Sequence, residues 1–352
     1  MYKVASLFCG CGGNDRGMVG GFRYNRKLYK KLPFSIVYAN DIDEKAIATY
    51  KANFGTKGVH CQDICTVDTN DIPDHDILVG GFPCQSFSTV NPTKDPFDDR
   101  ANLYKQMVRV AKAKLPKVIV AENVKGFMTL YKGKIFKRVK SEFEALGYTI
   151  YSSLLNASDY GIPQKRERVF IIGIHESINK EWEFPKATTP ERDTPLSIAV
   201  PKLELDEKKY YFSKRAVEGM KRAKNNMKRG LWQDLSEPCL TITSHLAKVS
   251  LNSRDPVLLV DPENELYRRF TPREAATIQS FPNSFKFVGS EGDAYRQIGN
   301  AIPPVLAWHI FNELRIFLNE TENEYKKPKK ETILKGKVEP DVNQIEVGIQ
   351  PF

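Results

Sequence analysis

The chain is 352 residues long and carries a formal net charge of +10 at pH 7. A chain of this length can bury a full core, and we expect it to divide into one large and one smaller domain. Its six cysteines lack the density of a secreted disulfide framework, and no apolar run approaches the ~20 residues of a membrane span. These features exclude a membrane protein and predict a cytoplasmic setting, while the basic balance favours a polyanionic partner.

The N-terminal region predicts a nucleoside pocket. A strand-like run over residues 3–8 enters a glycine-rich turn, Cys9 to Gly13, where the backbone can approach a ligand closely. The glycine spacing is not the dinucleotide fingerprint, and a plain glycine turn is the alternative reading. A second strand-like run, Phe34 to Asn40, ends at Asp41, where a carboxylate can accept hydrogen bonds from ribose hydroxyls.

A basic, aromatic segment from Phe22 to Lys31 separates these two runs. Such a segment contacts phosphates or forms a solvated loop, and we expect the solvated loop. The cations of this basic segment are Arg23, Arg26, Lys27, Lys30 and Lys31, and it contains no acid. After the second strand-like run, a helix is predicted from Asp43 to Asn53, with Asp43 as its cap and Gly55 as its stop.

His60, Cys61 and Cys65 form the only cluster in the sequence that resembles metal ligands. The cluster lacks a convincing fourth ligand, so we expect no metal site. Asp63, between the two cysteines, is a further carboxylate in a loop near the predicted strand ends.

The stretch that organises the chain runs from Gly80 to Ser88, directly after an apolar run at residues 77–79. Because ligands in open α/β sheets collect beyond the carboxyl ends of strands, Cys84 is placed for nucleophilic chemistry. A small buried cysteine in a tight turn is the alternative. Residues 85–100 are polar and contain two prolines, which predicts a long loop beside the chemistry, and a helix is predicted at 101–114.

Two further strand ends carry chemistry. A buried strand from Lys117 to Ala121 ends at Glu122, which can supply a proton to a substrate that a thiolate attacks, unless it is a surface acid. An antiparallel pair is predicted at 148–156 and 168–174. The turn between them is basic and either is solvated or binds a phosphate or a base carbonyl; its cations are Lys165, Arg166 and Arg168.

Prolines break the strand–helix alternation from about Glu181, which predicts a domain boundary. We expect a catalytic and cofactor-binding domain at 1–180, a small domain at 181–290, a segment at 291–319 that returns to the first domain, and a flexible tail at 320–352. A helix predicted at 214–229 is densely basic. A solvated face is the alternative, but this density of one sign favours a phosphate backbone, which we assign to Lys221, Arg222 and Lys224.

In this order, the motifs resemble those of the DNA cytosine-5 methyltransferases. The resemblance covers about 3–175 and 267–318 and implies an α/β fold: a Rossmann-like mixed sheet of a methyltransferase with a second, smaller target-recognition domain. The matching motifs are Phe8 to Gly13, Gly81 to Gln85, Glu122 to Val124, Gln164 to Arg168, Arg269 to Glu274 and Gln297 to Asn300. The chain departs from the family at Arg100-Ala101, where Arg-Gly is usual, and in the insert at 22–33.

The resemblance also implies a role for each matching residue. Cys84 is the implied nucleophile toward C6 of cytosine, Glu122 protonates N3, and Arg166 and Arg168 hold the base. The S-adenosylmethionine pocket is implied at Phe8, Gly10, Gly12, Asp41, Asp63, Pro83, Leu103 and Asn300. Gln85 and Ser88 are implied on a mobile loop that closes over DNA, and Thr241 with Ile242 braces the flipped nucleotide.

The implied reaction is sequence-specific methylation of double-stranded DNA, by a monomer that works beside a cognate restriction endonuclease. Two alternatives are a relative that methylates tRNA and a catalytically silent DNA-binding module. The tRNA enzymes carry Pro-Pro-Cys at the nucleophile and a Cys-Phe-Thr tripeptide, whereas this chain has Phe-Pro-Cys and no such tripeptide. A silent module would be expected to lose the cysteine, the glutamate or the cofactor glycines, and all are present.

Overall fold

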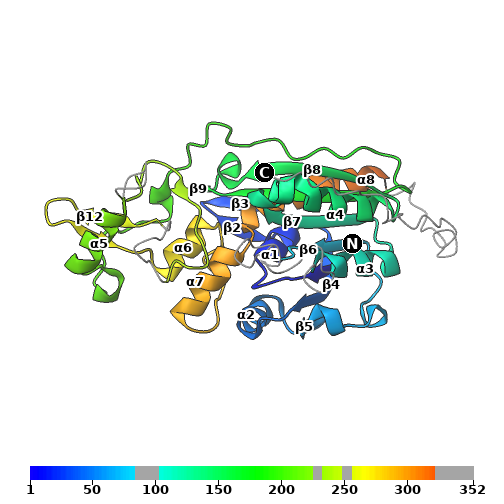
Figure 1. Ribbon diagram of the computed structural model, residues 1–352, viewed down its shortest axis with the longest axis horizontal. Coiled ribbons are helices and arrows are strands. Elements are labelled where there is room, and N and C mark those ends of the chain that lie inside the picture. The colour runs from blue at the N-terminus through cyan, green and yellow to red at the C-terminus, as the bar shows by residue number, and fades with distance from the viewer. Residues whose placement is uncertain (84–102, 225–231, 248–255, 322–352) are drawn as a thin grey trace, which may run out of the picture.

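The structure is a computed structural model that describes residues 1–83, 103–224, 232–247 and 256–321. A seven-stranded mixed sheet lies at its centre, in the order β5-β4-β1-β6-β7-β10-β8 (Figure 1). The first five run parallel, and β10 pairs antiparallel with β7 and with β8. The pairing of β8 with β10 was predicted. The strands are β1 (Tyr2–Leu7), β4 (Phe34–Asp41), β5 (Val59–Cys61), β6 (Ile77–Gly80), β7 (Val118–Val124), β8 (Tyr148–Asn156) and β10 (Glu167–His175).

The sheet has a topological switch point between β1 and β6. The chain leaves β1 to form β4 on one side and later returns to form β6 on the other side. Connections on the two sides therefore diverge, and a crevice forms beyond the carboxyl ends of these strands. The glycine-rich turn follows β1 and the Gly81-Phe82-Pro83 segment follows β6, so both reach this crevice.

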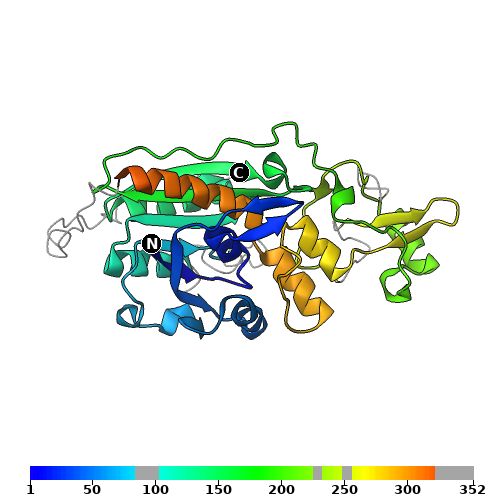
Figure 2. The same ribbon diagram turned by 180° about the vertical axis from the view of Figure 1, so that it is seen from behind.

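Helices cover both faces of the sheet, which explains why its strands read as continuous apolar runs. Along β7, Val118 and Val120 pack on one face with α8, while Ile119 and Ala121 pack on the other with α3 and α4. Figure 1 shows α3 and α4 on the near face, and Figure 2 shows α8 on the opposite face. The helices are α1 (Gly13–Val19), α2 (Glu44–Phe54), α3 (Tyr104–Lys114), α4 (Lys134–Glu144) and α8 (Pro304–Thr321).

Residues 22–29 form a hairpin, and the prediction of a solvated loop here is wrong. Strands β2 (Phe22–Tyr24) and β3 (Lys27–Tyr29) pair antiparallel and bury their aromatic rings. Tyr29 meets Trp308 of α8 edge-on, with ring centroids 5.3 Å apart. The Tyr24 hydroxyl donates to the carbonyl of Thr277. The hairpin therefore bridges α8 and α6 (Pro272–Ile278) (Figure 2). Its exposed side chains are Arg23, Asn25, Arg26, Lys27 and Leu28.

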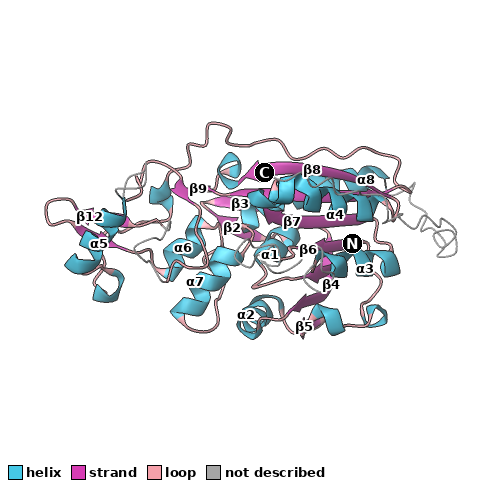
Figure 3. Ribbon diagram, viewed as in Figure 1, coloured by secondary structure: helices cyan, strands magenta, loops and turns pink. Residues whose placement is uncertain are grey.

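The rest of the chain forms a smaller part with few strands and long connections (Figure 3). A third core cluster joins it to the glycine-rich turn, because Cys11 packs there with Ile242, Phe281 and Ile298. The domain boundaries set out above stay a prediction. The elements are β9 (Gln164–Lys165), which pairs with β11 (Cys239–Leu240), α5 (Lys214–Lys224), β12 (Leu258–Asp261), β13 (Leu266–Arg268), α6 (Pro272–Ile278) and α7 (Glu291–Asn300).

Candidate active site

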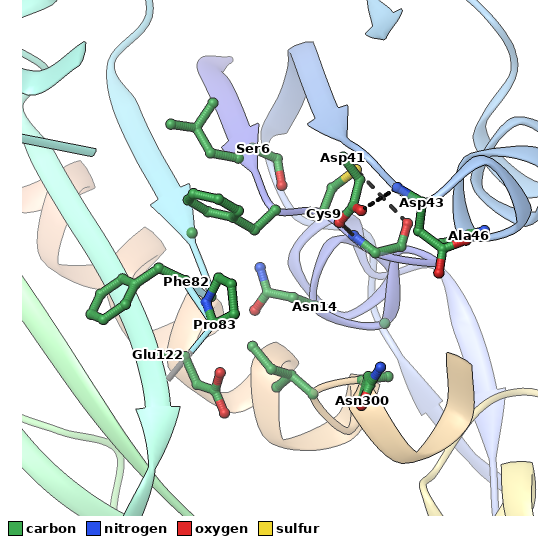
Figure 4. A pocket seen from close by; sticks show the side chains of 18 of the residues that line it. Ser6, Cys9, Asn14, Asp41, Asp43, Ala46, Phe82, Pro83, Glu122 and Asn300 are labelled. Carbon is green, nitrogen blue, oxygen red and sulfur yellow. Dashed lines mark hydrogen bonds between the residues drawn. The ribbon is translucent and has the colours of Figure 1, made fainter. Parts of the chain in front are cut away.

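A cavity of about 540 Å³ lies in the crevice beyond the carboxyl ends of β1, β4, β6 and β7. Figure 4 shows Asp41 at one end of it and Glu122 with Pro83 at the other, with Asn14 between them. Segments from both ends of the chain contribute, since α7 closes one side. The predicted site residues on its wall are Phe8, Gly10, Asp41, Asp63, Pro83, Leu103, Glu122, Arg168 and Asn300.

Asp41 is held rigidly at the end of β4. One carboxylate oxygen accepts the Gly10 N–H at 2.8 Å, and the other accepts the Asp43 N–H at 2.9 Å. Burial raises the pKa of Asp41, and these backbone donors act against that rise. Each oxygen keeps a free lone pair, so the carboxylate can still accept from a ligand hydroxyl.

Two glycines of the turn have different roles. Gly10 has a left-handed φ of +54°, and a Cβ built on it would meet no atom within 4 Å. It lines the cavity as predicted. Gly12 does not line the cavity, which corrects its predicted role. A Cβ there would lie 2.4 Å from the ring of Phe54, so Gly12 lets the α2 rings pack against the turn.

Glu122 and Arg168 form an ion pair on the cavity wall, with 3.0 Å between Oε1 and Nε. They lie on the adjacent strands β7 and β10, where Phe170 is opposite Glu122 and Arg168 is opposite Val124. Only 13% of each side chain is exposed. Burial raises the pKa of Glu122 and Arg168 opposes that rise, so the balance favours a carboxyl that keeps a proton above its usual range.

The turn that leads to Cys84 lies beside Glu122. The second oxygen of Glu122 is 3.2 Å from the position that a Cβ on Gly81 would occupy. The Asn123 side chain donates to the Phe82 carbonyl at 3.1 Å and holds this turn. Pro83 lines the cavity. Three predicted residues, Cys84, Gln85 and Ser88, lie outside the described residues.

Arg166 does not reach the cavity, so its predicted contact with the base is wrong. The side chain is 1% exposed, and its two terminal nitrogens donate to three backbone carbonyls. It donates to Ile242 at 2.9 Å, to Gly299 at 2.8 Å and to Ala301 at 2.9 Å. Arg166 therefore joins residues 241–244, called the target segment below, to the cavity wall. It acts through other residues and is a positioning residue.

Of the predicted DNA-contacting residues, Thr241, Lys221 and Arg222 do not line the cavity. The Thr241 hydroxyl donates to the Lys165 carbonyl at 3.0 Å. Lys221 on α5 is paired with Glu265. Arg222 is 82% exposed and pairs with Glu218 at 3.7 Å. The helix is described as far as Lys224, whose side chain lies outside the described part.

The predicted metal-like cluster shows no metal geometry. His60 stacks on Tyr38 with ring centroids 4.7 Å apart, while Cys61 and Cys65 are exposed. Among the described residues, no three His, Cys, Asp or Glu side chains are grouped to hold a metal ion. Within the same residues, no helix is long and apolar enough to cross a bilayer.

Several polar residues that line the cavity were not predicted from the sequence, among them Asn14, Asp43, Arg296 and Gln297. Arg296 of α7 pairs with Asp43 at 3.3 Å and joins α7 to the start of α2. Gln297 could have been found, since it begins the Gln297 to Asn300 motif. Arg296 carries no sequence signal, because only the fold brings α7 to α2.

The fold and site define an α/β enzyme that binds a nucleoside-containing ligand at a switch point, beside a buried acid. Two solved structures share the fold. The S. pombe Dnmt2 methyltransferase has a TM-score of 0.71 at 21% identity and covers 91% of this chain and 99% of that chain. A putative DNA modification methyltransferase from an E. coli prophage has a TM-score of 0.67 at 24% identity, covering 91% and 100%. The predicted methyltransferase fold is confirmed.

A family model described as C-5 cytosine-specific DNA methylase matches residues 2–315. The chain therefore belongs to the C-5 cytosine-specific DNA methylases. The Type II methyltransferase M1.ScrFI of Lactococcus lactis subsp. cremoris is 36% identical, over 86% of this chain and 75% of that protein. M.FnuDI of Fusobacterium nucleatum is 30% identical, over 94% and 99%. The resemblance seen in the motifs is confirmed, and S-adenosylmethionine is the methyl donor of this family.

The cavity fits S-adenosylmethionine. Its volume lies within the usual range for ligand pockets. Asp41 offers fixed acceptors for ribose hydroxyls, and Asp63 lines the wall nearby. The acids Asp41 and Asp63 also suit a ligand that carries a positive sulfonium. When bound there, this cofactor supplies an electrophilic methyl group.

Proposed function

We propose that the chain methylates C5 of a flipped cytosine within a specific double-stranded DNA sequence, using Cys84 as nucleophile. The observation that carries this assignment is the buried Glu122–Arg168 pair beside the turn that ends at Pro83. It puts an acid with a raised pKa on the same wall as the residue that precedes Cys84. The cofactor end of the cavity, at Asp41, lies opposite (Figure 4).

The chemistry requires these residue types. Cytosine C5 is a weak nucleophile, so the Cys84 thiolate forms a bond to C6 while Glu122 gives a proton to N3. Electron density then moves to C5, which takes the methyl group. Loss of the C5 proton and the N3 proton restores the ring as the bond from sulfur to C6 breaks and the thiolate leaves. Because C6 is covered in a stacked duplex, the base must leave the helix.

Each charged residue of the wall has a task in this scheme. Glu122 must be protonated before it can give a proton to N3, and burial in the wall, where 13% of the side chain is exposed, raises its pKa and favours the protonated form. Arg168 fixes the carboxyl through Nε. Asn123 fixes the turn before Cys84 through the Phe82 carbonyl. These contacts set the direction from which the base is held.

We also propose that the enzyme is the modification partner of a restriction endonuclease that acts on the same DNA sequence. The similarity to relatives named Type II methyltransferases supports this proposal. A monomer in the cytoplasm is the simplest form that fits such a role. Recognition is assigned to the segment at about 182–266, which lies between the matching motifs.

Expression in a host without cytosine methylation tests the function. Base-resolution mapping of 5-methylcytosine should show full modification at one recurring DNA sequence and none in cells that carry Cys84→Ala. Modified RNA together with unmodified DNA would instead support the tRNA alternative. No modified cytosine in either nucleic acid, from folded wild-type protein, would contradict the proposal.

A further inference from the structure

Buried side-chain amides link the target segment to the cofactor wall. Gln164 and Gln279 are both fully buried, and their side chains meet between β9 and α6. The Ile242 N–H donates to Gln164 Oε1 at 2.8 Å, and Gln164 Nε2 donates to Gln279 Oε1 at 2.9 Å. Gln279 Nε2 then donates to the Ile298 carbonyl at 2.8 Å. One continuous line of hydrogen bonds thus runs from Ile242 to α7.

The ends of this line fix its direction. A backbone N–H at Ile242 can only donate, and a backbone carbonyl at Ile298 can only accept. Both glutamine amides must therefore have their oxygen toward Ile242 and their nitrogen toward Ile298. Flipping either amide would place two donors or two acceptors opposite each other. Chains of this kind are strong when every member is satisfied and costly when one is lost.

Arg166 makes a second connection between the same two places. Ile242 is held through its N–H by Gln164 and through its carbonyl by Arg166. The other bonds of Arg166 go to Gly299 and Ala301, on either side of Asn300. Gly299 also lies directly against the target segment, because a Cβ there would be 2.2 Å from backbone atoms of Thr243 and Ser244.

We propose that Gln279 is a positioning residue that couples cofactor binding to DNA binding. It lines neither site, and it fixes Ile298, which precedes the wall residues Gly299 and Asn300, in register with the segment at 241–244. A ligand that orders one of these segments lowers the cost of ordering the other, and the effect is reciprocal. The proposal rests on the proposed function and on the roles that the resemblance implies for Asn300 at the cofactor and for Thr241 at the DNA.

The coupling is measured as the ratio of two dissociation constants for S-adenosylhomocysteine, without and with a duplex that carries the methylated sequence. Calorimetry on wild-type protein should give a ratio of at least about 5, the lower end of typical coupling. Gln279→Met keeps the length of the side chain but removes both hydrogen bonds. Its ratio should fall to less than about 2.

Gln233→Met is the matched control. Gln233 also holds the residue before the target segment, because its Oε1 accepts the Leu240 N–H at 3.0 Å, but this contact leads to β11 and not to α7. This variant should keep the wild-type ratio. A loss of coupling in Gln233→Met equal to that in Gln279→Met would overturn the assignment to the amide line.

Gln279→Glu separates positioning from simple loss of packing. A protonated carboxyl can accept from Gln164 and donate to the Ile298 carbonyl, whereas an ionised one cannot donate. The ratio for this variant should therefore rise toward the wild-type value as pH is lowered, while the wild-type ratio changes less. A ratio that does not depend on pH would count against the proposal. Wild-type methylation without any coupling would defeat this inference alone, whereas absent methylation would defeat the proposed function.

Discussion

Glu122 and Arg168 come from neighbouring antiparallel strands and meet at 3.0 Å on the wall of the cofactor cavity. Two effects on the pKa of Glu122 oppose each other, because burial favours the neutral acid and the guanidinium of Arg168 favours the carboxylate. A carboxyl balanced in this way can donate a proton at a pH where an exposed glutamate is ionised.

Replacing Glu122 by glutamine should lower the rate of methyl transfer by about 10²- to 10⁴-fold, the usual contribution of a positioned acid. The wild-type rate should fall as pH rises through the raised pKa of Glu122, since the proton is then lost. The amide of the Glu122→Gln variant does not titrate, so the variant should lack this alkaline limb. Single-turnover rates across pH check both points, and an unchanged limb in the variant would remove Glu122 from the role of acid.

In Arg168→Gln, the fall of the methyl-transfer rate with rising pH should occur at higher pH than in wild type. Arg168 is the largest influence that lowers the pKa of Glu122 against burial, so its removal leaves the acid more firmly protonated. The maximal rate should still fall, because the ion pair that orients the carboxyl is gone. The pH profile of single-turnover rates measures the shift. A limb displaced to lower pH would mean that Arg168 does not act on Glu122.

Cofactor affinity should depend on two residues far apart in the sequence. Asp41→Asn and Asn300→Ala should each weaken S-adenosylhomocysteine binding by about 10- to 100-fold, the range for hydrogen bonds to charged groups. Asp41 and Asn300 line opposite sides of one cavity (Figure 4). Calorimetry checks the effect. Gln233→Met, outside the cavity, serves as the control, and unchanged affinity in both variants would refute the assigned cofactor site.

The basic helix α5 should hold phosphates without reading bases. Neutralising Lys221, Arg222 and Lys224 together should weaken binding to target and random duplexes and flatten the dependence of log K on log salt by about 0.9 per lost contact. Lys137→Gln on α4, an exposed cation, is the control. The paired Lys221 should contribute less than Arg222. A triple variant that methylates new sequences with an unchanged salt slope would show that α5 reads bases.

Asp15 should make stability depend on pH. It is fully buried and accepts from the hydroxyls of Ser6 and Tyr50, and burial raises its pKa. The folded chain therefore holds this proton more tightly than the unfolded chain, whose aspartate titrates near ~3.9. The stability due to this group is present below that value and is lost as pH rises through the folded pKa.

Asp15→Asn removes this titration. The free energy of unfolding is measured in urea for the variant and for wild type. The value for the variant minus that for wild type should increase as pH rises from about 4 and should then become constant. A difference that stays constant or shrinks over this window would show that Asp15 does not titrate as its burial requires.

The sequence predicted two strands of the site from the residues at which they end. The apolar run of β6 ends at a glycine, Gly80, and β4 ends at an acid, Asp41. The strands of the hairpin at 22–29 were not predicted, because the density of basic residues favoured a solvated loop over two short strands in which buried and exposed residues alternate. Phe22 and Tyr24 are buried on either side of the exposed Arg23, and the buried Tyr29 follows the exposed Leu28; such a period of two is typical of a strand.

The sequence could not separate the roles of Arg166 and Arg168. They lie two residues apart, yet one faces the cavity and the other is buried among carbonyls. The partners of Arg166 are 76 to 135 residues away along the chain, and no local pattern reports on such contacts. The positioning role of Gln279 was hidden for the same reason, because its partners are set only by the fold.

The central claim is that Cys84 forms a covalent bond to the target base, and a duplex with 5-fluorocytosine at the mapped site tests it most directly. Fluorine cannot leave C5 as a proton does, so the bond from sulfur to C6 should persist after methyl transfer. Mass spectrometry of wild-type protein with duplex and S-adenosylmethionine should show one DNA adduct on the peptide that contains Cys84. Cys84→Ala should bind the same duplex without an adduct, and an adduct on another residue, or none with active wild-type protein, would contradict the account.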